Sequence, residues 1–158
     1  IYGDYIITIN KFYNPYRFVL TLVHELAHYF VTIEHYKPKP HGKLWKSKFK
    51  NLLEPILNES VFPKDLLNCL LIHMKEPKST FSYDLVLSKV LDKYDNSNEK
   101  YSYLDEVQDG EIFIYGDGNK FLKIKKRRKR YLCENLHTKR KYLFLGNAKI
   151  KIYENSSN

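Results

Sequence analysis

NPYRFVLTLVHELAHYFVTI, residues 14–33, carries the strongest structural pattern in this chain of 158 residues. Asn14 is a good helix N-cap and Pro15 suits the first helical position, so the pattern predicts a helix over residues 16–33. Apolar residues recur along it at spacings of three and four. The main stripe is Val19, Val23, Leu26, Phe30 and Ile33, and it is widened by Leu20, Ala27 and Val31. We expect this helix to be buried on most sides.

The middle of the same helix reads His24-Glu25-Leu26-Ala27-His28. Side chains at i and i+4 share a helix face, so both imidazoles can face one ion with Glu25 beside it. Bound zinc lowers the pKa of its water from ~15.7 to about 7. The pattern therefore predicts two zinc ligands and a general base. The alternative is a hydrogen-bonded pair of core histidines, although ionisable groups in an apolar helix need a partner and a divalent cation is one.

A catalytic zinc takes three protein ligands, so a third must come from elsewhere in the chain. The candidates that follow the helix are Glu34, His35 and His41. In the metzincin pattern a glycine would stand at position 31 and a histidine at 34, where this chain has Val31 and Glu34, which disfavours that family. His41 follows a PKP loop and precedes Gly42, so the chain can turn back there and present its ring. We predict His41 as the third ligand.

Further elements are expected on both sides of this region. YIITIN, residues 5–10, is rich in β-branched residues and predicts a short strand. Helices are predicted over residues 43–57, from Pro63 until Pro77, and over residues 83–91. His35, His73 and His137 are expected to be ordinary histidines outside the metal site.

DNSNEK, residues 95–100, is the most linker-like segment, and a domain boundary is expected near residue 100. After it come five β-prone runs separated by turn sequences, namely EIFIYG, FLKIKK, RKRYLCE, KYLFLG and AKIKIY. The predicted fold class is α+β. A mainly helical domain with a short β element spans residues 1–100, and a small basic antiparallel β module spans residues 101–158.

HELAHYF, followed by HGKLWKSKF so that His41 comes 13 residues after His28 (41 − 28), resembles the SprT-like zinc metallopeptidase family, which includes the eukaryotic Spartan proteases. The upstream ITIN and NPYRFVLTLVHELAH segments resemble bacterial members, so the resemblance covers residues 5–57. It implies a compact zincin-like domain, one catalytic Zn²⁺ held by His24, His28 and His41, and Glu25 as the catalytic residue. For Spartan it also implies cleavage of proteins crosslinked to or bound on DNA.

Many SprT-like proteins carry a C-terminal zinc ribbon with four cysteines, whereas this β module contains only Cys133. A second zinc site is therefore not expected, and the module is predicted to be a degenerate, zinc-ribbon-like sheet held by packing. The residues expected to pack there are Phe113, Tyr115, Phe121, Leu122, Tyr131, Leu132, Tyr142 and Phe144.

The chain has 27 Lys and Arg against 18 Asp and Glu, and residues 120–141 contain eleven cations with Glu134 as the lone acid. Such density indicates an anionic partner, and the interleaved Tyr131, Tyr142 and Phe144 could stack bases. We predict nucleic-acid binding without sequence specificity, with a solvated basic hairpin as the alternative. The predicted contact residues are Lys125, Lys126, Arg127, Arg128, Lys129, Arg130 and Arg140.

No apolar run approaches the roughly 20 residues that span a bilayer, the first residues lack the features of an export signal, and Cys69 and Cys133 are the only cysteines. We expect a cytoplasmic protein without a membrane partner. The expected function is a zinc-dependent endopeptidase that acts on protein or peptide substrates, including DNA-associated proteins. The alternatives are a non-enzymatic nucleic-acid-binding or transcription-associated protein with a structural zinc, and a helical interaction module without metal.

Overall fold

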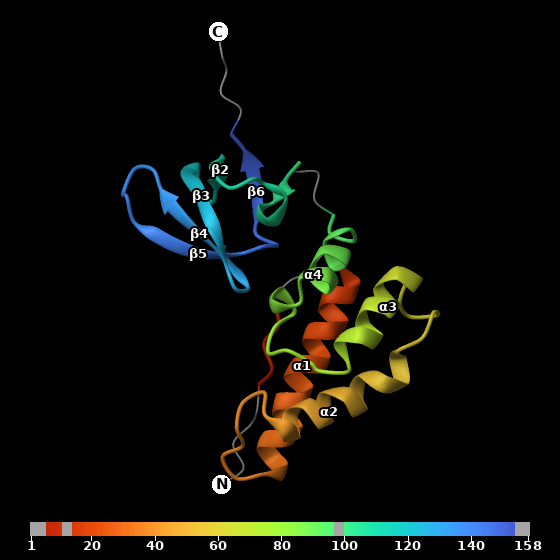
Figure 1. Cartoon of the computed structure of the whole chain (residues 1–158). Helices are drawn as coiled ribbons and strands as arrows, with labels where there is room; N and C mark the ends of the chain where they lie inside the picture. The colour runs from red at the N-terminus through yellow and green to blue at the C-terminus, as the bar shows by residue number, and fades with distance from the viewer. Residues whose placement is uncertain (1–5, 11–13, 97–99, 154–158) are drawn as a thin grey trace. The chain divides into compact units, whose positions relative to one another are not determined.

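The computed structural model describes residues 6–10, 14–96 and 100–153. The chain divides into two compact units, Ile1–Asn96 and Ser97–Asn158, close to the boundary expected near residue 100. The described helices α1–α4 lie in the first unit and an antiparallel six-stranded sheet lies in the second (Figure 1), so the fold class is α+β. Within the described residues, no helix has the length and apolar character needed to cross a membrane.

Four α-helices form the described part of the first unit. They are α1 (Pro15–Glu34), α2 (Lys43–Leu53), α3 (Lys64–His73) and α4 (Leu85–Asp92), with 3-10 turns at Glu54–Ile56 and Phe81–Tyr83. The predicted helices are thus present, but the second ends earlier than residue 57. Its last part becomes a 3-10 turn because Pro55 has no N–H to continue the α-helical hydrogen bonds.

The helices share one apolar core. In α1 the buried residues are Leu20, Val23, Ala27 and Val31, which follow one another at spacings of three and four. Ile33 is 48% exposed, so the expectation that α1 is buried on most sides was wrong. Other helices cover only one side of α1, and its remaining faces are half-buried or exposed.

The strand predicted over residues 5–10 is not present in the described residues 6–10, and residue 5 lies outside the described part. Ile6 is 83% exposed. A β-strand requires a neighbour for its backbone hydrogen bonds, and all described strands belong to the second unit. The expected short β element of the first domain was therefore wrong for these residues.

Asn14 joins the beginning of α1 to the end of α4. Its Oδ1 accepts hydrogen bonds from the N–H groups of Tyr16 and Arg17, at 3.0 and 3.2 Å. Its Nδ2 donates to the carbonyl oxygen of Leu91 and to Oδ1 of Asp95, both at 2.8 Å. The side chain thus caps one helix and satisfies a buried carbonyl of another.

Replacing Asn14 with Ala is expected to lower the free energy of unfolding by roughly 2–3 kcal/mol, because the cap and a buried hydrogen bond are lost together. Urea unfolding followed by circular dichroism measures it. Asn51→Ala is the control, since Asn51 is exposed on α2 and makes no hydrogen bond within the described residues. Equal stability of the two variants would contradict this role of Asn14.

The sheet of the second unit has the order β1-β6-β2-β3-β4-β5, and every neighbouring pair is antiparallel. Its strands are β1 (Ser102–Tyr103), β2 (Ile112–Tyr115), β3 (Asn119–Arg127), β4 (Arg130–Asn135), β5 (Lys141–Leu145) and β6 (Lys149–Ile152). The five predicted runs correspond to β2–β6. Sequence patterns did not indicate β1, because two residues are too few for an alternating pattern.

One face of this sheet is covered by the segment after β1. The buried cluster consists of Leu104, Val107, Phe113, Phe121, Tyr131, Cys133 and Ile150, with Phe144 and Ala148 packed against it. Phe113, Phe121, Tyr131 and Phe144 pack there as predicted. Tyr115 and Tyr142 are each 42% exposed but contact the edge of the cluster, with ring centroids 5.0 Å from Phe144 and 5.7 Å from Phe121 respectively. Leu122 and Leu132 are half-buried outside this cluster. Alternation places Leu122 and Leu132 on the opposite face of β3 and β4, which no described element of the unit covers.

Candidate metal centre

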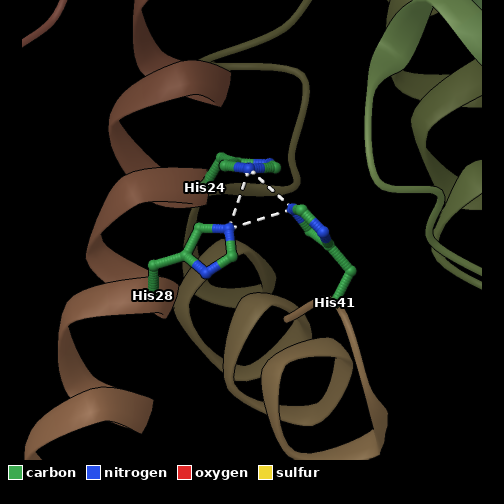
Figure 2. Close-up of side chains that lie close together, drawn as sticks. All are labelled: His24, His28 and His41. Carbon is green, nitrogen blue, oxygen red and sulfur yellow. Dashed lines mark hydrogen bonds between the residues drawn. The ribbon is translucent and has the colours of Figure 1, made fainter. Parts of the chain in front are cut away.

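Three histidine rings converge beside the middle of α1. His24 and His28 lie one turn apart on α1, and His41 comes from the loop that precedes α2. Their Nε2 atoms lie 3.2 Å (His24 to His28), 3.0 Å (His28 to His41) and 3.3 Å (His24 to His41) apart. Figure 2 shows the three rings with these nitrogens turned toward one another. The three residues that the sequence predicted as ligands are therefore brought together.

This triangle of nitrogens fits a metal ion. A tetrahedral ion with metal–nitrogen bonds of about 2.0–2.1 Å holds its nitrogen ligands about 3.3–3.4 Å apart, close to the observed 3.0–3.3 Å. Hydrogen bonds alone cannot account for the three contacts. A ring nitrogen either carries a proton or offers a lone pair, so at least one side of the triangle must join two donors or two acceptors. A cation at the centre removes this conflict, because all three nitrogens then act as electron-pair donors.

The environment keeps the two helix histidines neutral. Burial and the neighbouring His28 and His41 lower the pKa of His24 to about 4. Burial and His41 also lower the pKa of His28, while the charge of Glu25 acts in the opposite direction. Since a protonated imidazole cannot bind a metal, these shifts keep the lone pairs available at neutral pH.

The main chain at His41 adopts a conformation that few non-glycine residues use. Its φ of 54° lies in the left-handed region. The next residue, Gly42, donates its N–H to the carbonyl oxygen of Lys39 at 3.0 Å, and a Cβ at Gly42 would lie only 2.9 Å from that oxygen. The HG pair is thus a tight turn that only glycine permits at its second position, and it directs the ring of His41 back toward α1.

Trp45 forms the apolar floor behind the three rings. It is 1% exposed, and its ring centroid lies 4.8, 5.4 and 4.8 Å from those of His24, His28 and His41. It stacks on Phe49 at 5.0 Å, and its indole N–H donates to the carbonyl oxygen of His24 at 3.4 Å. From the sequence, Trp45 is expected either to pack behind His41 or to line the cleft, with packing favoured; its contact with all three rings is not predicted. Its position one turn after His41 in α2 is the signal that could have indicated this.

Glu25 follows His24 directly on α1, and its side chain is half-buried. Its charge acts on His28. Within the described residues, its carboxylate makes no hydrogen bond or ion pair. It is therefore an acceptor free for a water molecule or a substrate at the edge of the histidine cluster.

The other histidines lie outside the cluster, and so does Glu34, which was a candidate for the third ligand. Glu34 forms an ion pair with Lys48 at 2.7 Å. His35 and His137 are exposed. His73 is buried, with its Nδ1 2.8 Å from Oδ2 of Asp84. In the part of the chain that the structure describes, His24, His28 and His41 form the one group of potential metal ligands.

The described β module has no metal-ligand group of its own. Cys133 is buried in the sheet, and burial raises the pKa of its thiol to about 11. A thiol with a raised pKa is a poor metal ligand, since the thiolate is the binding form.

The predicted nucleic-acid contacts lie on the β3–β4 hairpin and just before β5. All seven side chains are exposed, and within the described residues none of them forms an ion pair; they are Lys125, Lys126, Arg127, Arg128, Lys129, Arg130 and Arg140. The expected interleaved aromatic surface was wrong in part. Tyr131 is 8% exposed and Phe144 packs against the sheet core, so only Tyr142 remains accessible for stacking. Alternation along β4 turns Tyr131 to the covered face of the sheet.

Comparison with protein-family models, with curated proteins and with solved structures found no match to this chain. The sequence motifs and the geometry of the three histidines are therefore the features that indicate its function.

Proposed function

We propose that this chain is a zinc-dependent endopeptidase of the SprT-like type. The observation that carries the proposal is the meeting of three Nε2 atoms within 3.3 Å of one another, two from α1 and one from the turn before α2. Three imidazoles suit zinc, and three protein ligands leave a coordination position open for reaction. The resemblance of HELAH and HG to the SprT-like motifs supports the same residues.

Bound zinc supplies Lewis-acid polarisation of a carbonyl oxygen and a lowered water pKa. The residues of the chain supply the remaining functions. His24, His28 and His41 would hold the ion as neutral ligands, so its charge would not be cancelled. Glu25 would accept a proton from water and return it to the leaving amine; its position next to His24 and its charge effect on His28 support this role. Trp45 supports the three rings from behind and excludes water from that side.

A structural zinc in a non-enzymatic protein is the competing function. Structural zinc sites are closed by four protein ligands, whereas the cluster in the described residues has three. A free carboxylate at Glu25 also has no role in a structural site. Both observations favour the peptidase.

The test compares the purified protein with its Glu25→Gln variant, first for metal content by elemental analysis and then for cleavage of an unfolded protein. One zinc per chain in both proteins, with cleavage by wild type alone, is the expected result. Zinc well below one per chain, after purification without chelator, would instead favour a helical interaction module without metal.

Substrates associated with nucleic acid are the second part of the proposal. The exposed cations of the β3–β4 hairpin have no acidic partners among the described residues, and closely spaced like charges repel one another unless an anion is bound. With Tyr131 buried, we expect binding through the phosphate backbone, with little stacking of bases.

Replacing Arg127, Arg128 and Arg130 together with Gln is expected to weaken binding to a DNA oligonucleotide and to flatten its salt dependence. Each lost phosphate contact removes about 0.7–0.9 from the slope of log affinity against log salt, so three contacts remove roughly 2–3. Fluorescence anisotropy between 50 and 200 mM salt, about the range over which such contacts are screened, measures the slope.

The matched control removes the same charge from the first unit, through Lys64→Gln, Lys75→Gln and Lys93→Gln. We expect its salt slope to stay close to that of wild type. If the two triple variants behave alike, net charge rather than the hairpin is responsible, and the hairpin is not the interface.

A further inference from the structure

The segment that delivers His41 to the metal centre is strongly basic. Residues 35–50 contain six lysines and no Asp or Glu. Three of these lysines already have partners in the first unit, namely Glu76 for Lys46, Glu34 for Lys48 and the main-chain oxygen of Lys75 for Lys50. The remaining three are Lys37, Lys39 and Lys43. They are exposed, and within the described residues they have no acidic partner.

These three lysines, called the rim lysines below, are attached to the same turn as the third ring of the metal centre. Lys39 and Lys43 are each two residues from His41. A Cβ built on Gly42 would lie 3.2 Å from Cβ and 3.5 Å from Cγ of Lys39, so the stem of this lysine lies against the HG turn. Lys37 lies four residues before His41, and its Nζ is 5.1 Å from the ring centroid of Tyr36.

The loop presents these cations on a restrained main chain. Pro38 and Pro40 fix their own φ angles, and Pro40 also limits Lys39 before it. Lys37, which precedes Pro38, has a φ of 47° in the left-handed region. The N–H of Gly42 closes the turn on the oxygen of Lys39 at 3.0 Å. Little backbone freedom is therefore lost when an anion binds the rim lysines.

Lys43 occupies a position that is unfavourable for a cation. It is the first residue of α2, where the helix dipole favours negative charge. The first turn of α2 has no acidic residue, and no side chain caps it. The preference for negative charge at a helix N-terminus is thus not followed two residues from His41. Such departures are typical of positions that serve a ligand and not stability.

From this arrangement we infer that Lys37, Lys39 and Lys43 bind carboxylates of the substrate, so that the metal centre acts preferentially on acidic, unfolded polypeptide segments. This inference rests on the proposed peptidase function. Around the site, residues 24–50 contain six lysines and only Glu25 and Glu34 as acids, and Glu34 is already paired with Lys48. A positive surface of this kind concentrates anionic chains and orients them.

A polypeptide fits these observations better than a nucleic acid. The rim lysines are separated along the chain, in contrast to the consecutive cations of the β3–β4 hairpin. Lysine carries a compact charge on a flexible stem, which suits carboxylates at variable positions of an unfolded substrate.

The experiment uses two fluorogenic peptides that differ only in having Asp and Glu, or Asn and Gln, on both sides of the same central sequence. Zinc-loaded wild type is expected to cleave the acidic peptide with a kcat/KM about tenfold higher, since each exposed charge pair contributes a factor of roughly 1.4–5. Replacing the three rim lysines with Gln is expected to bring this ratio close to one. Lys64→Gln, Lys75→Gln and Lys93→Gln together form the control, with the wild-type ratio.

Replacing the rim lysines with Glu separates recognition from loss of folding. This variant is expected to prefer a third peptide, in which Lys and Arg replace the acids, over the acidic one. A preference that reverses cannot arise from misfolding. If both triple variants keep the wild-type preference, the inference is wrong.

A binding measurement makes the result independent of cleavage. Zinc-loaded Glu25→Gln protein is titrated with the labelled acidic and amide peptides, and anisotropy is expected to show about tenfold tighter binding of the acidic one. Equal affinities would overturn the inference even if both peptides are cleaved. Tighter binding of the acidic peptide without cleavage by wild type would uphold the recognition and reject the peptidase.

Nucleic acid as the true ligand of the rim has its own signature. This experiment uses a protein in which all seven predicted nucleic-acid contact residues are replaced with Gln, so that the contribution of the rim is isolated; they are Lys125, Lys126, Arg127, Arg128, Lys129, Arg130 and Arg140. If a single-stranded oligonucleotide then displaces the acidic peptide, and the rim lysine substitutions abolish its binding, the rim serves phosphates and the inference is overturned.

Discussion

Glu25→Gln protein is expected to bind one zinc and to cleave an unfolded protein substrate roughly 10²–10⁴ times more slowly than wild type, the range for removal of a general acid–base group. Gln is nearly the same size as Glu and keeps the helix intact, but it cannot accept a proton at neutral pH. The carboxylate of Glu25 is half-buried beside the cluster and, within the described residues, has no partner whose loss would disturb the fold. Activity is therefore expected to fall without a change in stability.

The matched control is Glu34→Gln on the same helix. Glu34 forms an exposed ion pair with Lys48, whose loss costs less than about 1 kcal/mol. We expect its cleavage rate to stay within a factor of two or so of wild type, since a surface substitution has little effect. Wild-type activity in the Glu25 variant would remove this residue from the mechanism, whatever the metal content.

His41→Asn is expected to lower zinc affinity by roughly a hundredfold or more, because loss of a supporting contact alone costs 10–100-fold and here a ligand itself is lost. Asn is chosen because His41 has a φ of 54°, a conformation that Asn tolerates better than Ala. The turn and α2 should therefore persist, and circular dichroism checks that they do. Competition against a chromophoric chelator measures the affinity.

His35→Asn provides the control for this change. His35 is exposed and lies outside the group of potential ligands, although it is closer in sequence to α1 than His41 is. Its removal is expected to leave zinc affinity unchanged. A His41 variant that keeps wild-type affinity would mean that the two helix histidines bind zinc with another partner, and the open three-histidine site would be wrong.

Much of the local structure could be predicted from short-range patterns. The cap at Asn14, the apolar spacing after it and the HELAH motif all act within a few residues of each other, and α1 appears where they indicate. The β-prone runs after residue 100 predicted β2–β6 correctly, because these patterns also act within a few residues. His41 could be chosen among three candidate ligands because a proline-rich loop followed by glycine can reverse the chain.

Other features depend on which parts of the chain meet. Residues 6–10 are of strand-forming types but have no neighbouring strand among the described residues, so the strand that their composition predicted does not form there. Tyr131 was expected both in the packed sheet and on an accessible basic and aromatic surface, and the register of β4 decides for the core. In each case the outcome is decided by a partner that is distant in sequence, and a local pattern does not contain that partner.

By itself, the sequence determined the helix that carries two of the three rings and the identity of the third, because helical periodicity and turn chemistry are local. Tertiary structure alone decided that the three nitrogens close to within 3.3 Å and that Trp45 supports all three rings. It also decided that, among the described residues, three of six neighbouring lysines have neither a hydrogen-bond nor an ion-pair partner. The physical reason is that distances between rings and the pairing of charges depend on how α1 and α2 pack. That packing is set by the shared core of the first unit and not by any one segment.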